Sequence, residues 1–430
     1  MKSGILLPPI AAWIRARRSL DRDLIDNAGA IAIGSGTTAL LGFAYWLLAA
    51  RGVEAQSVGI AAAIISILAI TGLVGDFGLG SFLLGATNGD SKAAPELIWS
   101  ALWSSAVIGA LTGLLALIVI HVGIPSIGPA ISSSGDQAFF VASSALTSFC
   151  LVLDQGLVGL LDGRRQMIRN LLFSILKLVL LAALIVAAGA QAQPMGIVAS
   201  WIVGKALATL LVLMPHPLLG GKAWRCTSFS ELAGLGPTLL SHHGLNLASQ
   251  IPALVMPVIT ISLVGATENA AFYAGWMLLQ VASLVPASLS TVLYSVAVRE
   301  PNQVPRRMRL SLSASAFTTL ATIAGFVVLG SFALSIFRSE YAQIMNGAIQ
   351  LFGLGLIGIT VKCHFIAVTR MNNQHWSGTL NLVVGGLMEI GLAALGAHSW
   401  GLLGLTLGWL LGQAVSSVLM LPTIIRVVRL

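Results

Sequence analysis

Apolar segments of about 20 or more residues follow one another along almost the whole chain. A helix rises ~1.5 Å per residue, so a run of this length crosses the ~30 Å hydrocarbon core of a bilayer. A helix also satisfies its own backbone hydrogen bonds, which lipid cannot do. The predicted transmembrane helices are 29–50, 57–84, 97–121, 137–161, 170–189, 195–215, 237–263, 269–297, 310–336, 344–368, 377–397 and 401–424. The sequence therefore predicts an all-α polytopic membrane protein of about 12 helices.

The composition agrees with lipid as the main surroundings of this chain. Only 9% of the residues are charged and 57% are hydrophobic, which is more apolar side chain than a water-soluble fold could cover. The net charge of +8 could indicate nucleic acid, but the basic residues border the apolar runs and form no patch. We expect the lipid bilayer, and not nucleic acid, as the partner of these charges.

The basic residues fall on one side of the predicted helices. Alternating the sides from the N-terminus places 18 of the 23 lysines and arginines in one set of loops, with only Arg51 and Arg338 in the opposite set. Because positively charged loops stay in the cytoplasm, we expect an inner (plasma) membrane protein with both termini cytoplasmic. Residues 1–28 are expected to be a cytoplasmic lead, since the apolar run after them is too long for a signal peptide.

The longest break between apolar runs lies at the midpoint of the chain. It divides the sequence into the lead (1–28), an N-terminal six-helix lobe (29–215), a cytoplasmic linker (216–236) and a C-terminal six-helix lobe (237–430). An even number of helices in each half makes the two repeats parallel, and a binding site is then expected between them.

The cysteines and histidines give no sign of a metal or cofactor site. Cys150, Cys226 and Cys363 lie in or beside apolar segments without metal-type spacing. His242 and His243 also lack a second ligand at such spacing. We expect neither a metal nor a cofactor.

Six segments spread along the chain form one pattern. They are GFAYWLLAARG (42–52), VGIAAA (58–63), DFGLGSFLL (76–84), DQGLVGLLDGRR (154–165), the segment 270–298 and AVTRMNNQHW (367–376). In their order and spacing they resemble the polysaccharide transporters of the multidrug/oligosaccharidyl-lipid/polysaccharide (MOP) flippase superfamily, which includes O-antigen and other repeat-unit flippases. The resemblance implies a two-lobed alternating-access fold of the MATE/MOP type. It also implies a lipid-linked oligosaccharide as cargo and a place in polysaccharide or lipopolysaccharide biosynthesis, with polysaccharide polymerase machinery as a further partner.

Six charged side chains fall inside predicted helices, where each costs at least ~2.5 kcal/mol to insert. They are Asp76, Asp154, Lys177, Lys205, Lys362 and Glu389. Asp154 and Lys177 lie at similar distances from the Arg164–Arg165 turn, which predicts an ion pair between neighbouring helices. Both a structural pair and a proton- or ion-coupling site fit this spacing. For Asp76, close to a helix end in a Gly-rich stretch, a structural role is favoured.

The three remaining embedded charges lie in helices six, ten and eleven. Lys362 is about two turns from a helix end and could extend to water, whereas Lys205 and Glu389 lie near mid-membrane. A cation at that depth suits the diphosphate of the cargo that the resemblance implies. Lys205 is therefore a candidate substrate contact, with an internal ion pair as the alternative.

Polar side chains form a stripe on the seventh predicted helix. His242, Asn246 and Gln250 fall on one face, followed by two prolines that would bend the helix. Such a stripe faces either a cavity or another helix, so these residues are candidate substrate contacts with helix packing as the alternative. Gln280 on the next helix shares a face with Tyr273 and Trp276, which fit either sugar stacking or anchoring at the membrane interface.

Four classes of function fit a chain of this kind to different degrees. A flippase for a polyprenyl-diphosphate-linked oligosaccharide is the leading hypothesis. A multidrug or cation-coupled extruder would rely on embedded carboxylates, and here lysines and carboxylates are equal in number. A polymerase or ligase needs a large outer loop with catalytic groups, whereas the longest, about 122–136, holds no His or Arg, so we expect no enzyme. A non-transporting scaffold for polysaccharide assembly remains open.

Overall fold

The computed structural model describes residue 34 and residues 36–86, 94–160, 162–214, 236–299, 301–372 and 374–429. These parts are helical, with short turns between the helices and no strand among them. The predicted lead and most of the predicted linker lie outside the described residues.

The helices follow the predicted order. After a first helix over 36–52 come α2 (Ala55–Asp76), α3 (Leu79–Ala86), α4 (Ala94–Gly123), α5 (Ser134–Gly159), α6 (Gly163–Ala188), α7 (Pro194–Leu213), α9 (Gly236–Leu263), α10 (Ala266–Arg299), α11 (Val304–Phe337), α12 (Ser339–Ile344), α13 (Ala348–Phe352), α14 (Gly355–Met371) and α15 (His375–Arg429). Ten helices within the described residues are long and apolar enough to cross a membrane. The last of them, α15, changes direction at Trp400 and Gly401, where the predicted helices 377–397 and 401–424 meet.

The predicted helix over 57–84 is broken in the structure. Phe77 and Gly78 both have positive φ, 47° and 78°, and these left-handed residues separate α2 from α3. Asp76 stabilises the break, because its carboxylate accepts hydrogen bonds from the backbone N–H groups of Gly78 and Gly80, both at 3.1 Å. The prediction of one continuous helix was therefore wrong at this point, and the favoured structural role of Asp76 agrees with these bonds.

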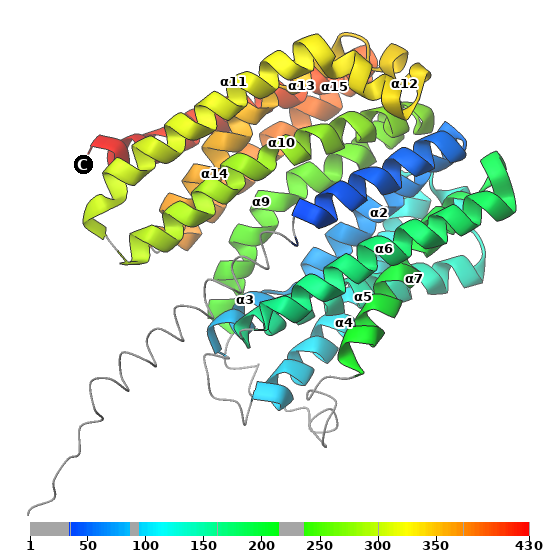
Figure 1. Cartoon of the computed structure of the whole chain (residues 1–430), viewed down its shortest axis with the longest axis horizontal. Helices are drawn as coiled ribbons and strands as arrows, with labels where there is room; N and C mark the ends of the chain where they lie inside the picture. The colour runs from blue at the N-terminus through cyan, green and yellow to red at the C-terminus, as the bar shows by residue number, and fades with distance from the viewer. Residues whose placement is uncertain are drawn as a thin grey trace, which may run out of the picture.

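The helices up to α7 lie in one half of the molecule and those from α9 onward in the other (Figure 1). Within the first half, α4 packs on α5 and α6 on α7, and within the second α15 packs on α9 and α14. Helix α2 joins the two halves, because it packs against both α9 and α10.

The halves meet most tightly where α2 and α10 begin. Asn269 on α10 donates a hydrogen bond to the carbonyl oxygen of Gly59 on α2, at 2.8 Å. A Cβ atom on Gly59 would lie only 1.7 Å from the carbonyl oxygen of Ala266, so only glycine allows this approach. We call this end of the bundle the Gly59 end, and the opposite end, where Gly78 lies against α9, the Gly78 end.

Aromatic and polar contacts extend the closure at the Gly59 end. Phe43 on the first helix contacts the ring of Phe337 edge-on, with ring centroids 4.9 Å apart. Arg51, at the end of the same helix, donates a hydrogen bond from Nε to the carbonyl oxygen of Ile336, at 2.8 Å. The first helix and α11 are thereby joined as well as α2 and α10.

Candidate functional site

Two neighbouring cavities lie between the halves. Cavity 1, of about 550 Å³, is lined by the first helix, α6, α7, α9 and α10. Cavity 2, of about 370 Å³, is lined by α2, α3, α5, α7 and α9. Trp201 and Leu254 line both, so the cavities adjoin at these two side chains. Along α2 and α10 the lining residues follow Gly59 and Asn269, which places the tight contact of the halves on one side of both cavities.

Lys177 projects from α6 into cavity 1. Its residue is 2% exposed, and its ammonium group lies 3.6 Å from the ring centroid of Trp201 and 4.7 Å from that of Phe173. The backbones of α6 and α7 approach closely here, since a Cβ atom on Gly204 would lie 2.8 Å from the backbone nitrogen of Lys177. The close approach brings the side chain of Lys177 against Trp201 of α7.

Lys205 projects from α7 into cavity 2. Its ammonium group donates a hydrogen bond to the hydroxyl of Thr147, at 3.3 Å, and lies 5.7 Å from the ring centroid of Phe173. The two lysines therefore lie near one aromatic ring, on opposite sides of the cavity junction. Within the described parts of the chain, neither ammonium group has a carboxylate at ion-pair distance.

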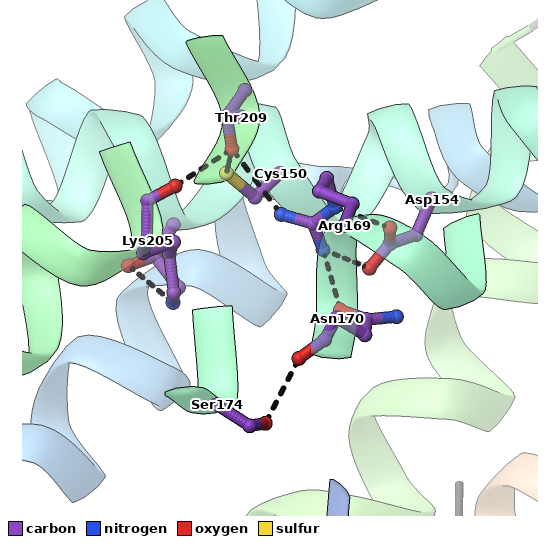
Figure 2. Close-up of polar contacts among 8 residues, drawn as sticks. Cys150, Asp154, Arg169, Asn170, Ser174, Lys205 and Thr209 are labelled. Carbon is purple, nitrogen blue, oxygen red and sulfur yellow. Dashed lines mark hydrogen bonds and ion pairs between the residues drawn. The ribbon is translucent and has the colours of Figure 1, made fainter. Parts of the chain in front are cut away.

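Asp154 pairs with Arg169 (Figure 2), so the predicted partner Lys177 is replaced by an arginine. The guanidinium group contacts both carboxylate oxygens, with Nε donating to Oδ1 at 2.8 Å and Nη2 donating to Oδ2. It also donates to the hydroxyl of Thr209 at 3.3 Å and to the side-chain oxygen of Asn170 at 2.9 Å. Arginine suits this position because its planar fork matches a carboxylate in two places.

The predicted Asp154–Lys177 pair was wrong because the start of the fifth predicted helix was misplaced. The basic residues after Asp162 were interpreted as a loop, but α6 already begins at Gly163. With α5 ending at Gly159, Asp154 lies five residues from one side of the turn and Arg169 six residues from the other. Arg169 is therefore the residue at matching depth.

The second buried ion pair lies in the other half. Lys362 donates to Oε1 of Glu389 at 2.7 Å, and Gln413 and Ser416 donate to the same carboxylate at 3.3 Å each. Lys362 could have extended to water from its place near a helix end, but α14 packs against α15 and places it beside Glu389 instead. Neither residue lines cavity 1 or cavity 2. Lys362 and Glu389 therefore neutralise each other inside the second half, away from the cavities.

The structure places most of the predicted polar stripe at the cavities. Asn246 and Gln250 of α9 line cavity 2, and Gln280 of α10 lines cavity 1. Asn246 also connects the halves, because it donates to the hydroxyl of Ser81 on α3 at 3.2 Å. The side chain of His242 lies outside the described residues. Lys205 and the three amides are thus brought to adjoining cavities.

Sequence reasoning missed several residues of the cavities, chiefly Trp46, Thr147, Asn170, Phe173 and Trp201. Tyr273 and Trp276, which were already considered for sugar stacking, line cavity 1. The spacing of Asn170, Phe173 and Lys177 by three and four residues puts them on one helix face, and this signal was available. The spacing of Trp201 and Lys205 by four residues was another.

No protein-family model matches the sequence, and no curated protein matches it. Solved structures do match. One, described as the "Inward-facing conformation of a multidrug resistance MATE family transporter of the MOP superfamily", has 17% identity and a TM-score of 0.68, and covers 91% of this chain and 94% of that chain. The "Outward-facing conformation" of such a transporter has 16% identity and a TM-score of 0.61, with 94% and 95% covered.

A third structure concerns a MOP superfamily transporter from Pyrococcus furiosus, described with the words "Reverse polarity of binding pocket suggests different function". It has 17% identity and a TM-score of 0.58, and covers 94% of this chain and 95% of that chain. At such identities the likeness establishes the fold. The chain is an all-α polytopic protein with a MATE-like fold, and the predicted fold class is confirmed.

The arrangement offers chemistry for a ligand with several parts. Two cations stand at the junction of the cavities, amides and hydroxyls line cavity 2, and aromatic rings line cavity 1. Lys177 faces cavity 1 and Lys205 faces cavity 2, so a negatively charged group in either cavity would meet a cation.

Proposed function

We propose that this protein is a flippase that moves a lipid-linked oligosaccharide carrying a diphosphate across the inner membrane. The observation that carries the proposal is the pair of lysines, Lys177 and Lys205, at the cavity junction. A charge in this depth of the membrane is costly unless it is neutralised. Arg169 and Lys362 have carboxylate partners, whereas Lys177 and Lys205 face the cavities without one in the described structure. An anionic cargo supplies the missing charge.

The remaining lining suits the other parts of such a cargo. Cavity 2 presents hydroxyl and amide groups, among them Thr147, Asn246 and Gln250, which hydrogen-bond sugar hydroxyls. Cavity 1 is wider and more apolar, and Val281 and Leu284 at its edge are well exposed. An apolar edge lets a lipid chain remain in the bilayer while the headgroup occupies the cavity.

The state of the structure fits alternating access between two lobes. Under the predicted topology the Gly59 end faces outward, and the halves are joined there by Asn269 and by the Phe43–Phe337 contact. The likeness to a structure described as inward-facing supports the same reading. We propose that the helices up to α7 and those from α9 onward move as two lobes, with both termini in the cytoplasm.

A drug extruder of the same fold is the second candidate, since structures described as multidrug transporters share the fold. A cationic drug would need a free carboxylate in the cavity. Asp76 is a carboxylate of cavity 2, and its oxygens accept bonds from Gly78 and Gly80. The two cations disfavour this candidate. A scaffold without transport would have no use for an open polar cavity.

The test is flipping of a fluorescent polyprenyl-diphosphate-linked oligosaccharide by the purified protein in liposomes. We expect Lys205→Ala and Lys177→Ala each to reduce flipping strongly, and Lys205→Arg to retain part of it, because the charge persists. The double variant Lys362→Met with Glu389→Gln is the matched control, since it removes a buried lysine away from the cavities. Flipping by both alanine variants at the wild-type rate, with normal incorporation, would remove the lysines from the site.

A further inference from the structure

An aromatic ring occupies the place beside Lys177 that a carboxylate usually takes beside a buried lysine. The ammonium group lies 3.6 Å from the ring centroid of Trp201, with Phe173 and Tyr45 at 4.7 and 5.3 Å. The face of an indole carries partial negative charge and attracts a cation. Arg169 and Lys362, which line neither cavity, have carboxylate partners instead.

We propose that Trp201 is a positioning residue that holds the Lys177 ammonium at the cavity junction until a phosphate or diphosphate group of the ligand takes it over. The proposal rests on the anionic cargo of the proposed function. An ammonium–phosphate contact in a water-poor cavity is stronger than a cation–π contact, so the exchange is favourable. A carboxylate partner would instead compete with the ligand for the same cation.

The packing around Trp201 explains why the ligand would displace the Lys177 ammonium group and leave the indole ring in place. Three rings contact the indole. Tyr45 and Phe173 lie edge-on, with ring centroids at 5.1 and 5.5 Å, and Trp46 is tilted at 6.0 Å. The side chain of Lys177 is a flexible four-carbon stem, and its ammonium group lies at the wall of cavity 1. A short movement of the ammonium group is therefore enough to change partners.

Trp201 also lies at the junction between the cavities that the two lysines face. It lines both cavities and lies four residues before Lys205 on α7, on the same face of that helix. A dianionic group at the junction would contact Lys177 from cavity 1 and Lys205 from cavity 2. The Trp201 ring thereby holds the Lys177 ammonium group in position for a dianionic ligand, which binds two cations.

The test uses the fluorescence of Trp201, because a nearby ammonium group quenches an excited indole. Inorganic pyrophosphate is added to the purified full-length protein in detergent, and the emission of each variant is compared with that of the wild type. We expect pyrophosphate to raise wild-type emission and the change to vanish in Trp201→Phe and in Lys177→Met. Lys177→Arg should keep a change, since a guanidinium group also stacks on indole.

The matched control is Trp103→Phe. Trp103 on α4 lines neither cavity, and its ring contacts Trp99 and Phe149, with no lysine over it in the part of the chain that the structure describes. This variant should respond to pyrophosphate as the wild type does. A wild-type response in Trp201→Phe, or the same loss in Trp103→Phe, would overturn the proposal.

Direct binding of radiolabelled pyrophosphate separates positioning from packing. Trp201→Leu should weaken binding about tenfold, because the free ammonium group is no longer held at the junction, whereas Trp201→Phe keeps a ring face and should lose less than about threefold. Equal binding by Trp201→Leu and wild type contradicts the positioning role. Equal losses in both variants indicate a packing defect and contradict it too.

Two further ligands distinguish the source of the anion. A short-chain polyprenyl diphosphate and inorganic phosphate are tested beside pyrophosphate, and a Trp201 response to the lipid alone assigns the site to the lipid headgroup. A response to pyrophosphate as well assigns it to the diphosphate itself.

A Trp201 response in a protein that flips no lipid would overturn the proposed function only, whereas Lys177-dependent flipping without a Trp201 response to any ligand would overturn the positioning role only.

Discussion

Asn269 on α10 donates a hydrogen bond over 2.8 Å to the backbone carbonyl of Gly59 on α2, and the two halves of the protein are closed at this contact. A side chain at position 59 cannot fit, because its Cβ atom would lie 1.7 Å from the carbonyl oxygen of Ala266. The close approach of α2 to α10 at this end therefore requires glycine at position 59. We expect any gate at this end to open by separating α2 from α10.

Gly59→Ala should shift the protein toward a state that is open at the Gly59 end. The measurement is labelling of a cysteine introduced at Ala274, which is 4% exposed, with a membrane-impermeant maleimide. Labelling should increase several-fold, and flipping should fall because the cycle cannot close. Gly325→Ala is the control, since a Cβ atom there meets nothing within 4 Å, and it should change neither property. Unchanged labelling in Gly59→Ala would mean that this contact is not a gate.

Asn269→Ala should act in the same direction but more weakly. It removes one buried hydrogen bond, which contributes about 1 kcal/mol, and leaves the close backbone approach intact. The same cysteine-labelling assay should show a smaller increase than in Gly59→Ala. A larger increase than in Gly59→Ala would contradict the steric explanation.

The Asp154–Arg169 pair should stabilise the first half of the protein. Removing one partner leaves a buried, unpaired charge, so Asp154→Asn or Arg169→Met should each lower stability by about 3 kcal/mol. Arg169→Lys should recover only part, because lysine cannot contact both carboxylate oxygens. Thermal unfolding followed by size-exclusion chromatography checks this, with Arg164→Met at the exposed start of α6 as control. The charge swap Asp154→Lys with Lys177→Asp should not restore stability, and recovery by that swap would contradict the observed pairing.

The orientation of the protein in the membrane remains a prediction from its basic residues. Reporter fusions at Gly135, Gly265 and Ser399 should report the outside, and fusions at Gly163, Gly221 and Asn302 the cytoplasm. Opposite results at all six sites would mean that the orientation is inverted and that the Gly59 end faces the cytoplasm. Mixed results would contradict the number of spans.

The amide groups of cavity 2 should affect transport more than folding. Replacing Asn246 and Gln250 together by Ala removes two neutral donors that line the cavity, and flipping should fall several-fold at normal expression. Gln374→Ala, on an exposed turn between helices, is the matched control. The liposome assay with the lipid-linked oligosaccharide measures both variants. Wild-type flipping by the double variant would limit the site to the lysines.

The sequence by itself determined which segments are helices and in what order they follow. Hydrophobic length fixes this, because a helix must span the bilayer and must satisfy its own backbone in lipid. Lys205, Asn246, Gln250 and Gln280 could also be selected as cavity residues, since each is a polar group in an apolar helix that needs a polar neighbour. These predictions use only local information.

The tertiary structure decided which of the buried charges meet. Asp154 was matched to Lys177 by depth, but the start of α6 at Gly163 brings Arg169 to that depth instead. The contact between Lys177 and Trp201 could not be predicted either, because it depends on the rotation of α6 against α7 and on the close approach that Gly204 allows. Depth in the membrane follows from sequence position, whereas the partner of a side chain depends on how two helices rotate and pack, and that is set by contacts between segments distant in the chain.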